Sequence, residues 1–217
     1  MAHIHLPDGV FSLQWVLFWW LLALGFLFAA LMASRRHTIA LQRLAVAGML
    51  AAASFAIFQI NVPYAGGVHM NLTPLIGILA GPGLGSLTIF IVNVLSAAVG
   101  HGGWGLIGAN TIINMTEIFV AFYVFKATHD RLEMFTRGAL AAIAGLLVGN
   151  AVFVFIILVS GIQGTQLSGV SLLLYVIQIP ILNFIVAVIE AIVTGFIVDY
   201  LAKVRPDLIQ WFTLSNK

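Results

Sequence analysis

Long apolar runs separated by short polar segments constrain this sequence more than any other feature. The first run covers residues 11–33, and a helix needs roughly 20 residues to cross a hydrocarbon core about 30 Å thick. Hydrophobic residues make up 62% of the 217 residues and charged residues only 7%, against about 25% charged residues in soluble domains. We therefore expect an all-α integral membrane protein of the cell membrane, folded as a single polytopic domain over residues 1–217.

The distribution of Lys and Arg predicts the topology of this domain. Further apolar runs indicate membrane-spanning helices over 44–60, 110–125 and 138–162, and within 172–202. Basic residues fall in three groups: Arg35, Arg36 and Arg43; Lys126, Arg131 and Arg137; Lys203, Arg205 and Lys217. Cytoplasmic loops carry the excess of Lys and Arg, so these groups are expected inside. Residues 1–10 hold no Lys or Arg, so the first run is expected to be a retained helix rather than a cleaved signal.

The stretch from residue 72 to residue 100 is too long for one helix. It would measure about 43 Å, and Gly81-Pro82-Gly83 interrupts it. The flanking segments 61–71 and 100–109 contain no Lys or Arg and are both expected outside. The chain must therefore cross twice here, as helices over 72–81 and 84–99 that turn on the cytoplasmic side. The prediction is seven transmembrane helices, with the N-terminus outside and the C-terminus cytoplasmic.

The segment NVPYAGGVHMN, residues 61–71, is expected to enter the protein. The helix that follows it has about ten residues and spans only about 15 Å, half of the hydrocarbon core. Irregular backbone at that depth is tolerated only where it is buried in protein or lines a cavity. Since the segment carries His69 and Asn71, it is the strongest pointer to a functional site.

Histidines gather on the predicted outer side. Four of the six, His3, His5, His69 and His101, fall in outer segments, whereas His37 and His129 fall in cytoplasmic ones. A single loop histidine is more often exposed or hydrogen-bonded than a ligand, but this gathering points to a metal ion. A free terminal amine, a backbone amide and an imidazole could also chelate one ion in a plane, an arrangement that suits Ni²⁺ or Cu²⁺. Because these nitrogens must lose protons, the affinity should fall in acid.

Three motifs carry a resemblance to a known family. They are HLPDGVFSLQWV (residues 5–16), GGVHMNLTPLIGILAGPGLG (66–85) and GHGGWGLIGANTIINM (100–115). Together they resemble the CbiM/NikM family, the substrate-binding membrane subunits of energy-coupling-factor transporters for cobalt and nickel. The resemblance covers most of the first 120 residues, and the last 80 resemble the family mainly in hydropathy.

The resemblance implies a seven-helix subunit that holds one Co²⁺ or Ni²⁺ on its outer side. Its ligands would be the terminal amine, the amide and imidazole of a histidine at position two, and an imidazole from the inward loop, which His69 matches. The family histidine directly follows the initiator Met, whereas His5 precedes Leu-Pro-Asp-Gly here. Three arrangements stay open: Ala2-His3 after removal of Met1, Met1-Ala2-His3 intact, or His5 as an imidazole ligand only. We expect Ala2, His3 and His69 as ligands, with His5 as an additional ligand or a support.

Other polar residues are expected to support this site. Asp8 would orient the N-terminal strip, residues 1–10, by accepting hydrogen bonds. Two stripes inside the predicted spans should face the bundle interior, because ionised side chains are costly in a bilayer. These stripes are Asn110, Asn114 and Glu117, and Asn183, Glu190 and Thr194. They would either position the loop HGGWGLIGAN, which begins with His101, or form packing hydrogen bonds between helices.

Gly48, Ala52 and Ala56 form a ridge of small residues that lets another helix approach closely. In the resembling family a comparable ridge contacts the transmembrane coupling subunit, and the alternative is that it packs within this chain. The resemblance further implies two ATPase subunits and often a small accessory membrane subunit. The sequence has no G-x-x-x-x-G-K-[ST] loop, so the chain is expected to be a transporter subunit, not an enzyme, with no cofactor of its own and Co²⁺ or Ni²⁺ as cargo.

Two other classes of function are less well supported by the sequence. An intramembrane metal-dependent enzyme with an outward-facing histidine site would need a nearby acid or nucleophile, and Asp8 is the only acidic residue predicted outside. A passive channel would need a continuous polar pore, for which the sequence offers only the two short stripes. The net charge of +2 gives no indication of nucleic-acid binding.

Overall fold

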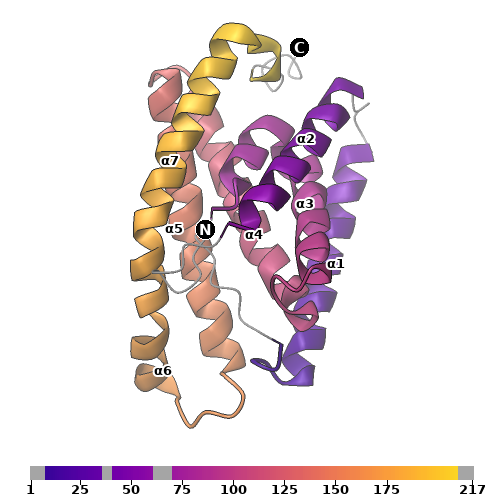
Figure 1. The fold of residues 1–217 in the computed structure, drawn as a ribbon, viewed down its shortest axis with the longest axis vertical. Helices are drawn as coiled ribbons and strands as arrows, with labels where there is room; N and C mark the ends of the chain where they lie inside the picture. Colours follow the sequence, from indigo (N-terminus) through magenta and orange to yellow (C-terminus); the bar gives the residue numbers. More distant parts are fainter. Residues whose placement is uncertain (1–7, 36–40, 61–69, 210–217) are drawn as a thin grey trace.

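A computed structural model describes residues 8–35, 41–60 and 70–209, and over these ranges the protein is helical without strands (Figure 1). Its elements are α1 (Leu13–Arg35), α2 (Leu41–Phe58), α3 (Thr73–Ala98), the 3-10 turn η2 (Trp104–Leu106), α4 (Ile107–Ala127), α5 (Met134–Ser160), α6 (Gly169–Val176), α7 (Gln178–Val204) and the 3-10 turn η3 (Pro206–Leu208). In the described ranges, six segments are long and apolar enough to cross a membrane. The chain is a multi-pass membrane protein. The predicted runs 11–33, 44–60, 110–125 and 138–162 correspond to α1, α2, α4 and α5, the predicted helices 72–81 and 84–99 both lie within α3, and the last run covers α6 and α7.

The long helix α3 is broken at Gly81. This residue has φ 78° and ψ 174°, which is left-handed, non-helical backbone that glycine tolerates. A Cβ added to Gly85 would lie 3.3 Å from Ile76 Cγ2 and 3.5 Å from the Ile76 carbonyl oxygen. In a continuous helix these two residues would be separated by a rise of about 13.5 Å. The chain therefore folds back on itself at Gly81, within the Gly-Pro-Gly break predicted from the sequence.

Arg43 stabilises this reversal from the first turn of α2. Its Nη2 donates a hydrogen bond of 3.1 Å to the Ala80 carbonyl, which is the last residue before the break. Carbonyl groups at a helix end lack intrahelical donors, and Pro82 has no N–H to offer. The arginine side chain therefore caps the first half of α3 and ties it to α2.

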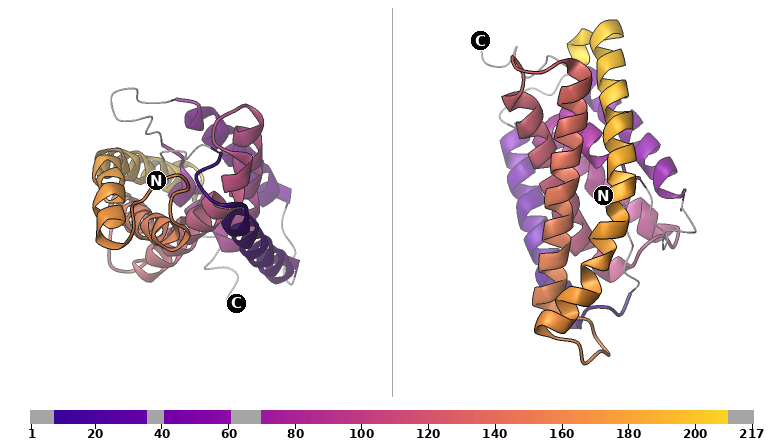
Figure 2. Two further views of the ribbon diagram at one scale, coloured as in Figure 1. Left: turned by 90° about the horizontal axis from the view of Figure 1, so that it is seen from below. Right: turned by 90° about the vertical axis from the view of Figure 1, so that its left-hand side faces the viewer.

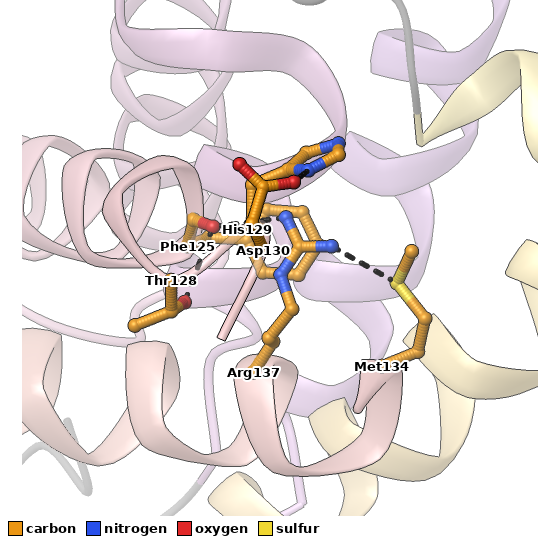
Figure 3. Close-up of polar contacts among 6 residues, drawn as sticks. All are labelled: Phe125, Thr128, His129, Asp130, Met134 and Arg137. Atoms are coloured by element: carbon orange, nitrogen blue, oxygen red, sulfur yellow. Dashed lines mark hydrogen bonds and ion pairs between the residues drawn. The ribbon is translucent and has the colours of Figure 1, made fainter. Parts of the chain in front are cut away.

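Arg137 lies on α5 and not in a loop, which corrects the helix start predicted at residue 138. The side chain is only 1% exposed, and its Nη2 donates a 3.0 Å hydrogen bond to the Phe125 carbonyl at the end of α4. Its guanidinium carbon lies 4.1 Å from the centre of the Phe125 ring, and Met134 Sδ accepts a further contact at 3.3 Å (Figure 3). Because the arginine turns back to cap α4, the helix begins four residues early, at Met134.

The helices form an elongated bundle with a partly polar interior. Figures 1 and 2 show α5 and α7 running side by side along one flank, with α1 on the opposite flank. Large apolar side chains such as Ile76, Ile118 and Leu146 are fully buried. Polar side chains are buried among them: Ser54, Asn71, Thr73, Asn93, Thr111, Asn114, Glu117, Asn150, Asn183, Glu190 and Thr194. These polar residues mark the region where a site can be built.

Candidate metal site

The predicted ligands Ala2, His3, His5 and His69 lie outside the described residues. The structure does describe the residues that follow them in the chain, Asp8 and Val10 after the strip and Asn71 after the His69 segment. The contacts of these three residues define how both ligand-bearing segments are attached to the bundle.

Asp8 attaches the N-terminal strip to the loop before α4. Its carboxylate accepts hydrogen bonds from the backbone N–H of Gly105 at 2.9 Å and of Trp104 at 3.2 Å. Gly103 is required here, because a Cβ at this position would overlap the Asp8 carboxylate. Two residues later, the Val10 carbonyl accepts a 2.8 Å hydrogen bond from Gln163 N–H. The end of the strip, residues 8–10, is thus held between the loops that precede α4 and follow α5.

Asn71 attaches the other segment to the centre of the bundle and is fully buried. Its carbonyl accepts a 2.6 Å hydrogen bond from Ser54 Oγ of α2, and its side-chain Oδ1 accepts one of 3.0 Å from Thr73 N–H at the start of α3. Its backbone N–H donates to Glu190 Oε2 at 3.3 Å, and its Nδ2 donates to Glu117 Oε2 at 3.5 Å. One asparagine therefore joins α2, α3, α4 and α7.

Glu117 of α4 and Glu190 of α7 are both 0% exposed. The helix α5 approaches Glu117 closely at Gly149, where an added Cβ would overlap the carboxylate. Sequence reasoning expected both glutamates to face the interior but missed their shared contact with Asn71, because residues 71 and 190 are far apart in the chain. The available signal was the presence of two isolated carboxylates within apolar spans.

His101 packs against α2, the helix that also contacts Asn71. Its ring packs against Phe58, with centroids 6.0 Å apart, and Phe58 is one helical turn beyond Ser54, the partner of Asn71. Burial lowers the pKa of His101 below its usual value, which favours the neutral ring, the form that binds metal ions. The structure thus joins Asn71 to Glu117 and places His101 against Phe58 of α2.

The predicted polar stripes form hydrogen bonds between helices. Asn114 Nδ2 of α4 donates to Asn93 Oδ1 of α3 at 3.1 Å, and Asn183 Nδ2 of α7 donates to Asn150 Oδ1 of α5 at 3.3 Å. Asn110 is only half-buried. The contacts of Asn114 and Asn183 therefore agree with the second alternative given above, in which the stripes form packing hydrogen bonds between helices.

Among the described residues, no group of three or more His, Asp or Glu side chains could hold a metal ion. The described part of the chain therefore supplies the surroundings of the candidate site, and its ligand set stays a prediction.

The ridge of Gly48, Ala52 and Ala56 is exposed along α2. A Cβ added to Gly48 would meet nothing within 4 Å. The alternative that this ridge packs against the described part of its own chain is therefore wrong.

The whole chain can be compared with known families. Residues 5–208 match the family model CbiM, described as the cobalt uptake substrate-specific transmembrane region. The chain is 30% identical over 215 residues to the putative fused nickel transport protein NikMN of Archaeoglobus fulgidus, covering 95% of this chain and 68% of that protein. It is 29% identical over 219 residues to the cobalt transport protein CbiM of Sorangium cellulosum, covering 95% and 94% of the two chains.

Solved structures share this fold. A crystal structure of a transition metal transporter superposes with a TM-score of 0.79 at 20% identity, covering 93% of both chains. A truncated transition metal transporter superposes with a TM-score of 0.80 at 20% identity, covering 92% of this chain and 99% of the other. The helical arrangement described above is therefore that of known transporters.

Proposed function

The chain belongs to the CbiM family, whose model describes a cobalt uptake substrate-specific transmembrane region, and from this premise we propose that it captures Co²⁺ or Ni²⁺ for an ATP-driven importer. The match of the family model over residues 5–208 carries the proposal. Curated relatives named as nickel and cobalt transport proteins support both ions as cargo.

The proposed ligands are Ala2, His3 and His69, with His5 as an additional ligand. Two attachments support this set. His3 is five residues before Asp8, and an extended chain of that length reaches about 17 Å. His69 is two residues before Asn71 and is held within about 7 Å of it by the same geometry. Imidazole nitrogens suit the late divalent metals.

The proposed topology has seven crossings, with the site on the outer face. Figure 1 supports the orientation, since the turn between α4 and α5 and the end of α7, which carry predicted cytoplasmic charges, lie at one end of the bundle. The connection from α5 to α6 contains no Lys or Arg and lies at the other end. The reversal at Gly81 supports two crossings within α3, because it turns this segment back toward the side from which it entered.

Elemental analysis tests the proposal. The purified protein is exposed to equimolar Co²⁺, Ni²⁺ and Zn²⁺, washed, and its metal content is measured per chain. About one Co or Ni per chain is the expected stoichiometry for a single closed ligand set. A preparation that retains no metal, or retains only Zn, would overturn the assignment as a cobalt or nickel capture subunit.

Replacing Asp8 by alanine should weaken Co²⁺ or Ni²⁺ affinity by about 10–100-fold, the usual effect of losing a group that orients a metal ligand. The substitution removes both hydrogen bonds to the loop at Trp104 and Gly105, so the strip loses one of its two attachments. Isothermal titration calorimetry measures the change. Asp130→Ala removes an exposed carboxylate at the α4–α5 turn and should leave the affinity unchanged.

The importer is proposed to contain a transmembrane coupling subunit, two ATPase subunits and a small accessory membrane subunit, with ATP hydrolysis by the partners driving release of the ion to the inside. The exposed ridge of Gly48, Ala52 and Ala56 supports close approach of a partner helix. It is the surface that we assign to the coupling subunit.

Ala52→Trp should abolish copurification of the coupling subunit while metal binding is retained, because the indole fills the space that a close helix contact needs. The matched control is Leu24→Trp, which adds the same ring at an exposed position of α1 and should leave the complex intact. If Ala52→Trp assembles normally, the ridge is not the coupling surface.

A further inference from the structure

Two buried carboxylates from different helices meet at one asparagine beside the candidate metal site. Glu117 and Glu190, here called the acidic pair, are both 0% exposed, and Asn71 donates a hydrogen bond to Oε2 of each. Ionised carboxylates are rare within membrane spans and are costly there. A positive charge close to the pair offsets this cost.

Buried oxygen atoms without a hydrogen-bond partner belong to Glu190 of the acidic pair and to residues close to Glu190 and Asn71 in the chain. In the part of the chain that the structure describes, Glu190 Oε1, Thr194 Oγ1 and Thr73 Oγ1 are buried without a hydrogen-bond partner. Glu190 and Thr194 are one turn apart on α7 and share a face, the face that Glu190 turns toward Asn71. Thr73 follows Asn71 by two residues and donates its backbone N–H to the Asn71 side chain. Buried polar atoms normally have partners, and a nearby cation would supply one for the free carboxylate oxygen of Glu190.

Chain geometry keeps the proposed ligand His69 near Asn71. The Cα atom of His69 is held within about 7 Å of that of Asn71, whichever conformation the segment adopts. An ion bound by His69 therefore lies in the field of both carboxylates. In a protein interior of low dielectric constant, charges at such a separation interact much more strongly than in water.

We propose that Glu117 and Glu190 act as positioning residues that balance the charge of the captured divalent ion through space, with Asn71 holding both carboxylates beside the His69 segment. This inference rests on the proposed function. It adds two residues whose negative charge lowers the electrostatic cost of holding a divalent ion inside the bundle. The carboxylates stay hydrogen-bonded to Asn71 and do not replace the imidazole ligands.

Substitution by Gln and by Asp distinguishes this electrostatic role from a structural one. Glu117→Gln and Glu190→Gln keep an oxygen that accepts the Asn71 hydrogen bond but remove the charge. Glu190→Asp keeps the charge but withdraws the carboxylate by one methylene from a hydrogen bond that already measures 3.3 Å. The readout is the Kd for Ni²⁺ measured by calorimetry.

Each Gln variant should bind Ni²⁺ about 10–100-fold more weakly than the unmodified protein, and Glu190→Asp should bind more tightly than Glu190→Gln. Glu133→Gln, which removes an exposed carboxylate just before α5, is the matched control and should bind normally. Gln variants with unchanged affinity, or an Asp variant weaker than the Gln variant, would overturn the proposal.

A second measurement uses the acidic pair intact, in case the Gln variants do not fold. Infrared difference spectra with and without saturating Ni²⁺ are recorded on the unmodified protein and on an Asp8→Asn variant, which removes the other carboxylate near the site. A shift of carboxylate bands on metal addition supports the proposal, and unchanged bands contradict it. If the unmodified protein binds no Co²⁺ or Ni²⁺, the proposed function fails. If it binds one of these ions and the Glu117 and Glu190 variants bind it with the same Kd, only the inference about the acidic pair fails.

Discussion

Replacing His69 by alanine is expected to abolish stoichiometric binding of Co²⁺ and Ni²⁺. His69 is the one histidine in the sequence of residues 61–71, and Asn71 of this segment is hydrogen-bonded to α2, α4 and α7. The substitution therefore removes the imidazole that this segment offers as a ligand. Metal content per chain after washing, measured by elemental analysis, should fall from about one ion to background.

His129→Ala is the control for loss of a histidine, because His129 lies at the α4–α5 turn, where it contacts Asp130 at 2.8 Å (Figure 3). This variant should keep full metal occupancy. If the His69→Ala variant still held about one metal ion per chain, the segment before α3 would not supply a ligand.

Gly108→Val should destabilise the fold by about 1–3 kcal/mol or more, the usual range for overpacking. A Cβ at Gly108 would lie 2.5 Å from the Trp20 nitrogen and 2.7 Å from the Trp19 carbonyl carbon. Both are backbone atoms of α1, so no side-chain rotation relieves the clash and the two helices must separate. The midpoint of thermal unfolding in detergent measures the effect.

The comparison for this substitution is Gly48→Ala, where the added Cβ meets nothing within 4 Å. Since alanine favours a helix over glycine by about 1 kcal/mol, this variant should be as stable as the unmodified protein or more so. A Gly108→Val protein that unfolds at the unchanged temperature would show that α1 and α4 do not cross closely at this point.

Much of the fold could be predicted because each helix is encoded locally. Apolar runs of membrane-spanning length indicate helices without knowledge of their partners, and the break at Gly81-Pro82-Gly83 follows from the absence of an N–H on proline and the freedom of glycine. The start of α5 was misplaced because Arg137 makes its contacts with Phe125 across a turn. From the sequence alone, the excess of Lys and Arg in cytoplasmic loops predicts a loop position for such a residue.

The candidate site could be predicted only in its parts. His69 and Asp8 stand out by residue type and position, whereas the joining of Glu117 to Glu190 through Asn71 depends on how three helices pack. From the sequence, the ridge at Gly48 could contact either a partner subunit or another part of the same chain. The exposure of this face of α2 distinguishes the two, because the ridge does not pack against the described residues. The ligand roles of His3, His5 and His69 remain predictions.

Asn71 also resists displacement at the start of α3. Displacing this residue breaks at least four hydrogen bonds together, to Ser54, Thr73, Glu117 and Glu190. At about 0.5–1.5 kcal/mol each, their combined loss makes the displaced state a small minority of the population. Movement of Asn71 therefore requires these hydrogen bonds to break together, which makes it a cooperative event rather than a gradual loosening.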